Sequence, residues 1–541
     1  MERTRRLLLG GDIWTEHGFV RGSLLLEGAV VEAIIPAGDP LPDDAVVVDV
    51  AGAAVLPGFV DAHAHPLIGG TEFSGAPVRE ARSVAEALRI VADHAAAHPG
   101  LPWVLGEGFD LSIDPRGSYS AADLDRVVPD RPVALRSSDI HTMWANTAAL
   151  RAAGITAETP DPEDGIIERD ADGAPTGTLR EWGAFMPLYR AIPRRTSGEI
   201  AEALRRGLDA LSAEGVTTVQ DAWVELDDLD GYLEAARGGL PVRLNLAFRA
   251  EPGRWRDQIA QFHAARERVA DLGIPEFTAR TVKFFADGII EGGTAHVAEP
   301  YHGTGCCGVP AWRPEELAEA ARACDAAGFQ LHIHAIGDAG LACAVDAIEG
   351  AAAANGPRDR RPVIAHAQLV RPRDLRRLVD ADVTVAIQPY WAKLDGVVRH
   401  LTNGRLHGDR AERQYPFETM RLAGVRLASS SDFPITTPSP LQALGVATSR
   451  DEHGDLGRSW LPAERLAFAD ALRAATAGAA YTQYAEGRLG VIAPGAAADL
   501  TIVHGLSRDP SPAELLAARV EAVWRDGEPA EPSALARAQA R

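Results

Sequence analysis

The sequence predicts an α/β protein: a (β/α)8 TIM barrel with a small β-sandwich domain built from both chain termini and an insertion subdomain after the first barrel strand. Three observations support this prediction. The middle of the chain alternates apolar strand-like segments with alanine-rich helical stretches, both ends of the chain carry short β-like segments, and one long stretch interrupts the alternation.

The barrel prediction depends on eight strand candidates within residues 57–485. Parallel strands that are covered on both faces read as nearly continuous apolar runs, and helical stretches such as 314–327, 338–354 and 372–380 separate the later candidates. The eight candidates are, in chain order, FVDAHAH, VTTVQDAW, VRLNLAFRA, RTVKFFADG, FQLHIHAIGD, PVIAHAQLV, VTVAIQPYW and VRLASSSDFP.

The two other predicted parts lie outside this alternation of strands and helices. Residues 1–56 and 486–541 contain short strand patterns with turn residues between them, so we expect one β-sandwich domain assembled from both termini. Roughly 140 residues separate the first strand candidate from the second, far more than a normal strand–helix connection. We therefore expect an inserted lid subdomain, residues 75–195, over the barrel mouth.

Composition narrows the function classes. A net charge of −22 over 541 residues argues against a nucleic-acid partner, because phosphate binding needs a basic surface. No apolar run is long enough to span a membrane. The apolar run near the start of the chain is too short to form the core of a signal peptide. Four cysteines fit a reducing compartment, so we expect a cytoplasmic protein. Cys306 and Cys307 lie between glycines, so we expect them in a loop. The sequence does not assign them a function.

The stretch PGFVDAHAHP at the first barrel strand contains two histidines that could bind a metal ion. Side chains alternate along a strand, so Asp61, His63 and His65 point to the same face. Two imidazoles at the end of a strand can bind one metal ion. A single His-x-His motif is weak evidence for a metal site, because a chain with this many histidines should contain about 0.5 such pairs by chance.

The ends of other predicted strands supply further polar residues. Lys283 lies on the fourth strand candidate, His334 and His366 end the fifth and sixth, and Asp432 ends the eighth. Active sites of barrels of this kind lie at the carboxyl ends of the strands. These side chains are therefore expected to converge with those of the first strand.

The chain resembles the amidohydrolase superfamily, and within it the branch that contains N-substituted formamide deformylase. The motifs that carry this resemblance are PGFVDAHAHP, VKFFADG, HAIGDAG, AHAQ and SSDFPI, in family order. The insertion motif RSSDIHTMWANTAAL and the C-terminal GRLGVIAPGAAADLTIV also match, so the resemblance covers nearly the whole chain.

The resemblance implies a metal site and a role for each ligand. It makes His63, His65, His334 and His366 metal ligands, with Asp432 as the catalytic aspartate that also touches the metal. Lys283 matches a lysine that in many relatives is carboxylated and bridges two metals. We expect one or two Zn²⁺ ions, two if Lys283 is carboxylated, because imidazoles with an open coordination position suit catalytic zinc.

Three nearby residues have competing interpretations. His332 shares a face with His334 but lies deeper, which favours a hydrogen-bonded histidine of the barrel interior. Asp61 either orients an imidazole or closes a turn. Asp338 stands where a helix begins, so helix capping is an alternative to a role at the metal.

Aromatic residues near the predicted mouth suggest a pocket for an apolar substituent. Each single one is also explained by packing. The candidates for substrate binding are Trp103, His141, Trp144, Trp182, Tyr390 and Trp391.

These observations predict a metal-dependent hydrolase of an amide-type C–N bond, for example in an N-substituted formamide. A carbamate, cyclic amide or ester hydrolase on the same site is an alternative, and a nucleobase deaminase is disfavoured by the long insertion. A regulatory or binding protein on the same scaffold is the alternative from another class. The expected partner is a small-molecule substrate, with neither nucleic acid nor membrane, and a homodimer is a further expectation.

Overall fold

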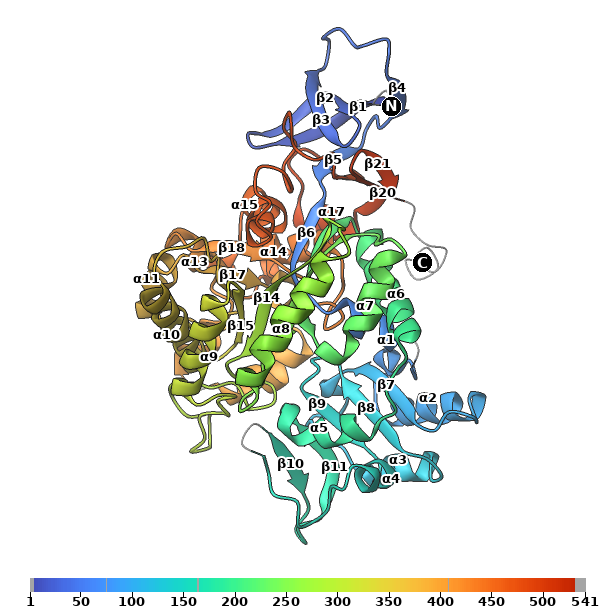
Figure 1. Cartoon of the computed structure of the whole chain (residues 1–541), viewed down its shortest axis with the longest axis vertical. Helices are drawn as coiled ribbons and strands as arrows, with labels where there is room; N and C mark the ends of the chain where they lie inside the picture. The colour runs from blue at the N-terminus through green and yellow to red at the C-terminus, as the bar shows by residue number, and fades with distance from the viewer. Residues whose placement is uncertain (1–3, 74, 163–164, 407, 531–541) are drawn as a thin grey trace.

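A computed structural model describes residues 4–73, 75–162, 165–406 and 408–530 of the chain. Three sheets organise it: a parallel sheet in the middle, a mixed sheet built from both termini, and a smaller sheet within residues 75–195. In Figure 1 the terminal sheet and the smaller sheet lie at opposite ends of the central sheet and its helices.

The central sheet is a nearly closed barrel of eight parallel strands, which confirms the predicted fold class. Backbone hydrogen bonds join its two ends: the Asp432 amide donates to the His63 carbonyl at 2.9 Å, and the His65 amide donates to the Phe433 carbonyl at 2.7 Å. In barrel order the strands are β6 (Phe59–Ala64), β12 (Val216–Val224), β13 (Arg243–Arg249), β14 (Phe277–Phe285), β15 (Gln330–Ala335), β16 (Val363–His366), β17 (Thr384–Ile387) and β18 (Arg426–Ser429).

Helices cover the outside of the barrel because each has one apolar face. Helix α6 (Ser197–Ala213) buries Leu204, Leu208 and Leu211, and a capping box of Thr196 and Glu199 starts it. The other helices that follow barrel strands are α7 (Leu229–Arg237), α8 (Trp255–Ala270), α9 (Pro314–Ala326), α10 (Asp338–Asn355), α11 (Pro372–Asp380), α13 (Phe417–Leu422) and α14 (Pro440–Ser449). Shorter helices are α12 (Asn403–Arg405), α15 (Phe468–Arg473), α16 (Ala479–Thr482) and α17 (Pro512–Ala517).

The terminal sheet is a single mixed sheet that contains strands from both ends of the chain. Its order is β21-β20-β19-β5-β1-β2-β3, with β4 paired to β1. The first five strands and the last three therefore meet in one sheet, so the predicted assembly from both termini is confirmed, although the structure shows one mixed sheet where a β-sandwich was expected. The bounds are β1 (Arg5–Thr15), β2 (Gly18–Glu27), β3 (Val30–Pro36), β4 (Val46–Asp49), β5 (Ala54–Pro57), β19 (Leu500–His504), β20 (Arg519–Arg525) and β21 (Glu528–Ala530).

Between β6 and β12 the chain forms a sheet of order β10-β11-β9-β8-β7 with its own apolar clusters. The strands are β7 (Val104–Phe109), β8 (Val133–Ser137), β9 (Thr142–Ala145), β10 (Ile166–Arg169) and β11 (Pro175–Arg180). The helices of this segment are α1 (Pro66–Glu72), α2 (Val84–Ala97), α3 (Ala121–Val127), α4 (Thr147–Ala152) and α5 (Glu181–Ala191).

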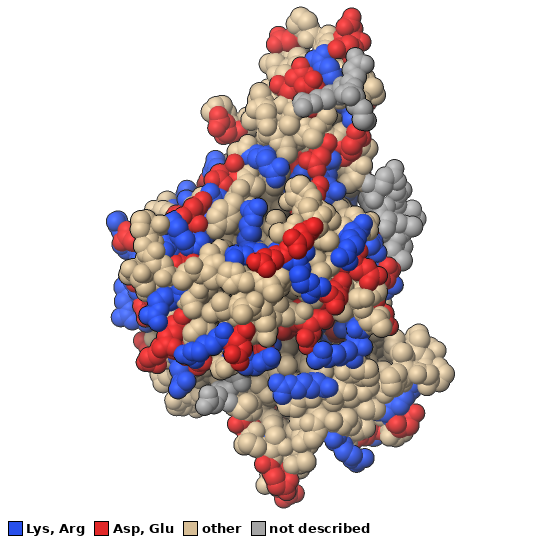
Figure 2. Space-filling view, in the orientation of Figure 1, with Lys and Arg blue, Asp and Glu red and all other residues tan. Residues whose placement is uncertain are grey.

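Acidic and basic side chains are interspersed over the face shown in Figure 2. In the described part of the chain, no helix combines the length and the apolarity needed to cross a membrane.

Candidate active site

The predicted site residues come together at the carboxyl ends of the barrel strands. His63 lies on β6 and His65 follows it, Lys283 lies near the end of β14, His334 near the end of β15, and His366 ends β16. Asp432 follows β18 in a backbone conformation with φ of 55°. All six side chains, the five just named and that of Asp432, are buried and line one cavity.

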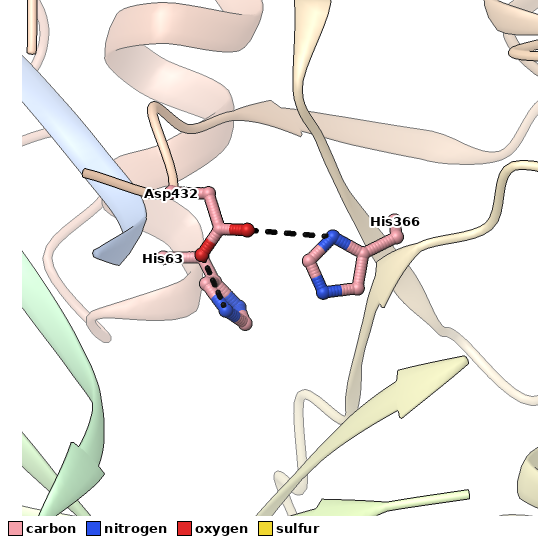
Figure 3. A group of neighbouring side chains, drawn as sticks. All are labelled: His63, His366 and Asp432. Carbon is pink, nitrogen blue, oxygen red and sulfur yellow. Dashed lines mark ion pairs between the residues drawn. The ribbon is translucent and has the colours of Figure 1, made fainter. Parts of the chain in front are cut away.

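His63, His366 and Asp432 form the centre of this group (Figure 3). One ligand atom from each lies within 4.8 Å of the other two. The Asp432 carboxylate approaches His63 Nε2 at 3.3 Å through Oδ1 and His366 Nδ1 at 4.0 Å through Oδ2. One metal ion can be held by one ligand atom from each of these three residues.

The remaining predicted ligands surround this centre. His65 Nε2 lies 3.0 Å from Asp432 Oδ1, and Lys283 Nζ lies 3.4 Å from His63 Nε2. The His334 ring packs against the His366 ring with centroids 4.5 Å apart. The structure therefore brings together all six residues that the sequence suggests as ligands.

Burial sets the protonation of these groups. It lowers the pKa of His63 and His334 well below the ordinary value, and nearby positive charge from Lys283 acts in the same direction. The imidazoles are therefore neutral and keep a lone pair for a metal ion. Burial alone would raise the pKa of Asp432, but the surrounding histidines hold it well below the ordinary value. Burial also lowers the pKa of Lys283 to about 7.

The site contains buried polar atoms that the described residues leave without hydrogen bonds. They include His65 Nδ1 and Asp432 Oδ1, although that oxygen is close to two imidazole nitrogens. Protein interiors rarely leave such atoms unpaired. Neutral imidazoles together with a carboxylate are the donor set that a catalytic divalent ion such as zinc prefers. The residues present thus fit a bound metal.

Two neighbouring side chains orient the imidazoles. His332 Nε2 lies 2.7 Å from His63 Nδ1, so His332 is a hydrogen-bonded histidine of the barrel interior. Gln388 donates through Nε2 to Ser430 Oγ at 2.8 Å and to the Ala386 carbonyl at 3.1 Å. Its Oε1 is then left to accept from His366 Nδ1 at 2.9 Å. The position of Gln388 directly after β17 was the available signal for this role.

Asp61 does not contact an imidazole. Its carboxylate accepts hydrogen bonds from the backbone amides of His63 and Ser431 and from the Ser431 hydroxyl. Asp61 therefore fixes the backbone of β6 beside the segment that carries Asp432. Of the two roles predicted for Asp61, the structure shows the one in which it holds the local backbone, and not the orientation of an imidazole.

The loop after β14 is held by carboxylates. Asp338 begins α10, and its Oδ1 accepts from the Ala298 amide at 2.8 Å instead of capping the helix. Asp287, in the ADG motif, accepts from the amides of His296, Ile336 and Gly337. The sequence interpretation missed Asp287, which lies 3.7 Å from His334 Nε2 through Oδ1.

The cavity above the ligands has a volume of about 270 Å³. Of the six predicted substrate-binding residues, His141, Tyr390 and Trp391 line it. Trp391 stacks on His366, with ring centroids 5.2 Å apart and an interplanar angle of 4°.

The other three residues lie elsewhere. Trp103 and Trp144 are buried in the apolar clusters of the insertion, and Trp144 donates to the Ser120 carbonyl. Trp182 packs against Trp223 behind the cavity wall, beside a smaller pocket. Trp103 and Trp144 thus belong to the core of the insertion, and Trp182 lies outside the cavity that the ligands line.

The insertion reaches the site through His141. Its Nδ1 lies 2.7 Å from Glu181 Oε2, and Glu181 Oε1 accepts from the Thr294 hydroxyl of the barrel. Ile140 and Glu181 both have positive φ, of 61° and 62°, a strained conformation for such residues. Nothing in the sequence near Glu181 indicated its role, because its partners are distant along the chain.

The barrel and its buried histidine–aspartate group define a metal-dependent hydrolase. The chain belongs to the amidohydrolase family, whose sequence model matches residues 46–530. The resemblance predicted from the motifs is thus confirmed at the level of the family.

Individual relatives are similar to this chain over most of their length. YtcJ of Bacillus subtilis (strain 168) is 30% identical over 521 residues, which cover 93% of each chain. The N-substituted formamide deformylase of Arthrobacter pascens is 28% identical over 480 residues, 86% of each chain. The crystal structure of an uncharacterized metal-dependent hydrolase from Pyrococcus furiosus shares the fold with a TM-score of 0.69 at 23% identity, and the match covers 94% of this chain and 100% of that one.

Proposed function

We propose that this protein hydrolyses an amide-type C–N bond of a small molecule, with an N-substituted formamide as the first candidate substrate. The observation that carries the proposal is that four buried imidazoles, Lys283 and Asp432 line one cavity around the group formed by His63, His366 and Asp432. The name of the Arthrobacter pascens relative supports the choice of a formamide.

The histidines His63, His65, His334 and His366 would hold Zn²⁺ together with Asp432. When bound, the ion supplies Lewis acidity, which polarises a substrate carbonyl and lowers the pKa of a water molecule from 15.7 to about 7. Lys283 is a candidate for carboxylation, since burial lowers its pKa to about 7 and an uncharged amine is the reactive form. A carboxylated Lys283 would allow a second ion.

Asp432 is the proton carrier of the reaction. It stays ionised because the surrounding imidazoles hold its pKa well below the ordinary value. It takes a proton from the attacking water and delivers it to the departing nitrogen. An amide needs this second transfer because an unprotonated amine leaves poorly.

The cavity walls favour an apolar group on the nitrogen. Trp391, Phe285, Ile140 and Ile289 supply apolar surface beside the ligands. His141 lies on the same wall, with its Nδ1 held by Glu181 and its other ring nitrogen free to donate to the substrate carbonyl oxygen.

The test is hydrolysis by the zinc-loaded full-length protein, alongside elemental analysis of its metal content. We expect release of formate and benzylamine from N-benzylformamide. Turnover of carbamates, cyclic amides or esters but of no formamide would assign the alternative substrates. Stoichiometric metal without hydrolysis of any of these compounds would favour the binding or regulatory class instead.

A further inference from the structure

Lysine is confined to the cavity in this protein. The sequence holds 52 arginines but only two lysines, Lys283 and Lys393, and both line the cavity. Arginine carries a planar guanidinium with five donors, whereas lysine carries a compact ammonium on a flexible stem, so the two are not interchangeable at a binding site. The occurrence of lysine at these two positions alone points to a need for the smaller cation there.

Lys283 is accounted for by its place among the metal ligands, but Lys393 is not. Lys393 follows the short helical turn Pro389–Trp391 at the carboxyl end of β17. Only 7% of the residue is exposed, although it belongs to the cavity wall. It thus shares the cavity with the ligands without being one of them.

The ammonium of Lys393 makes no close ion pair with a described residue. Its Nζ lies 3.3 Å from the centroid of the Tyr390 ring, which attracts the cation through its π face. Across residues 4–73, 75–162, 165–406 and 408–530 no hydrogen bond or ion pair within 4.0 Å to this ammonium occurs, and Asp395, two residues on, attracts it only from beyond that distance. Buried charges in proteins are normally paired and hydrogen-bonded. The Tyr390 ring therefore orients a cation whose N–H donors are available to a molecule in the cavity.

Apart from Asp432, which belongs to the metal site, the carboxylates of the same cavity differ, because the protein supplies each of them with a donor. They are Asp110 with the Ser112 amide, Asp139 with the Ser137 hydroxyl and the His141 amide, Glu291 with the Thr402 hydroxyl, and Asp395 with the Val398 amide. Four carboxylates near one lysine also disfavour a ligand with several negative charges. A ligand group with a single negative charge fits best.

We propose that Lys393 binds a carboxylate of the substrate. This inference rests on the proposed function and narrows its substrate class to N-acyl compounds with one carboxylate and an apolar group, such as N-formyl or N-acyl amino acids. In a formamide the carboxylate belongs to the amine part, because the formyl group carries no substituent. Lys393 is thereby a specificity-determining residue of the reaction.

The test compares two substrates that differ in the carboxylate alone, N-formylphenylalanine and N-formyl-2-phenylethylamine, with zinc-loaded full-length protein. We expect the wild type to prefer the acid about tenfold to a hundredfold in kcat/KM, mostly through KM, as for a hydrogen bond to a charged group. Lys393→Met should bring the ratio close to one, and Lys393→Arg should restore part of it. Lys393→Gln keeps a polar side chain of similar length and replaces the methionine variant if that one fails to fold.

Arg82→Met is the matched control, because Arg82 is an exposed cation at the rim of the same cavity. Its loss should change the preference less than about threefold, since solvent and salt screen an exposed charge. A wild type that prefers the neutral substrate, or a preference that survives Lys393→Met, would overturn the inference.

A binding measurement separates this inference from the proposed function. Calorimetry with 3-phenylpropanoate and the uncharged 3-phenylpropanol needs no turnover. Tighter binding of the acid that drops at least tenfold in Lys393→Met but not in Arg82→Met supports the Lys393 site even if no amide is hydrolysed. Equal binding of the acid by the wild type and Lys393→Met, or no binding, refutes it.

Discussion

The two ends of the barrel each bury a cluster of charged and polar side chains, and the clusters differ in how their atoms are paired. At the amino end, Arg243 of β13 contacts Asp499 and Asp526 of the terminal sheet. Asp499 also accepts from the Asp526 amide at 2.9 Å, so the cluster satisfies itself. At the carboxyl end, His65 Nδ1 and Asp432 Oδ1 have no hydrogen-bond partner among the described residues.

The difference separates a structural cluster from a functional one. Arg243 is 4% exposed and Asp499 2%, so they are as buried as the histidines. Burial and charge therefore do not identify the active site by themselves. What marks the active site is that the unpaired imidazole and carboxylate atoms lie together beside one cavity, where a ligand can pair them. The following predictions test this contrast, from the largest expected effect to the smallest.

Asp432→Asn should lower kcat by about a hundredfold to ten-thousandfold, the range for loss of general acid–base catalysis. His63→Ala should abolish turnover together with metal binding. Steady-state kinetics and elemental analysis measure both effects, with circular dichroism to verify the fold. Full activity in either variant would remove the carboxyl-end cluster from the mechanism.

Arg243→Met should lower the stability of the protein without affecting its metal binding. It leaves the buried Asp499 carboxylate without its cation, which should cost about 3–5 kcal/mol in the free energy of unfolding. Metal content at saturating zinc should stay at the wild-type level. Denaturant unfolding tests the first expectation, and a loss of metal without a loss of stability would reverse the roles of the two ends.

The His141–Glu181 pair should make stability depend on pH. Burial lowers the pKa of His141, but Glu181 outweighs this and raises it to about 9. Because the folded value lies above the unfolded value of about 6.5, the contribution is complete below pH 6.5 and is lost as pH rises through about 9. Over this window the metal-free protein should lose about 2–4 kcal/mol relative to Glu181→Gln. Thermal unfolding across the pH range tests this, and parallel pH profiles of the two proteins would contradict it.

Gln388→Leu should weaken zinc binding by about tenfold, because His366 loses the acceptor that orients its ring. Competition with a chromogenic chelator measures the affinity. Gln330→Leu is the matched control, since Gln330 is an equally buried barrel glutamine that contacts Thr281 and backbone carbonyls rather than an imidazole. Similar affinities of all three proteins would show that Gln388 does not support the ligand.

The barrel could be predicted from the sequence because parallel strands buried on both faces leave apolar runs such as VTTVQDAW, and all eight predicted runs form barrel strands. The strand-end histidines could be located for the same reason. Trp103 and Trp144 could not be separated from cavity residues, because an aromatic side chain in an insertion looks the same in either place. Glu181 and Lys393 escaped notice because their roles arise from contacts between distant segments.

The restriction of lysine to two cavity positions has a practical consequence. Apart from the amino terminus, Lys283 and Lys393 are the only primary amines of the chain. An amine-selective acylating reagent small enough to enter would therefore modify lysine side chains only in the catalytic pocket, with the amino terminus as the one other target. Protection from such labelling, followed by mass spectrometry of two peptides, would report directly which compounds occupy it.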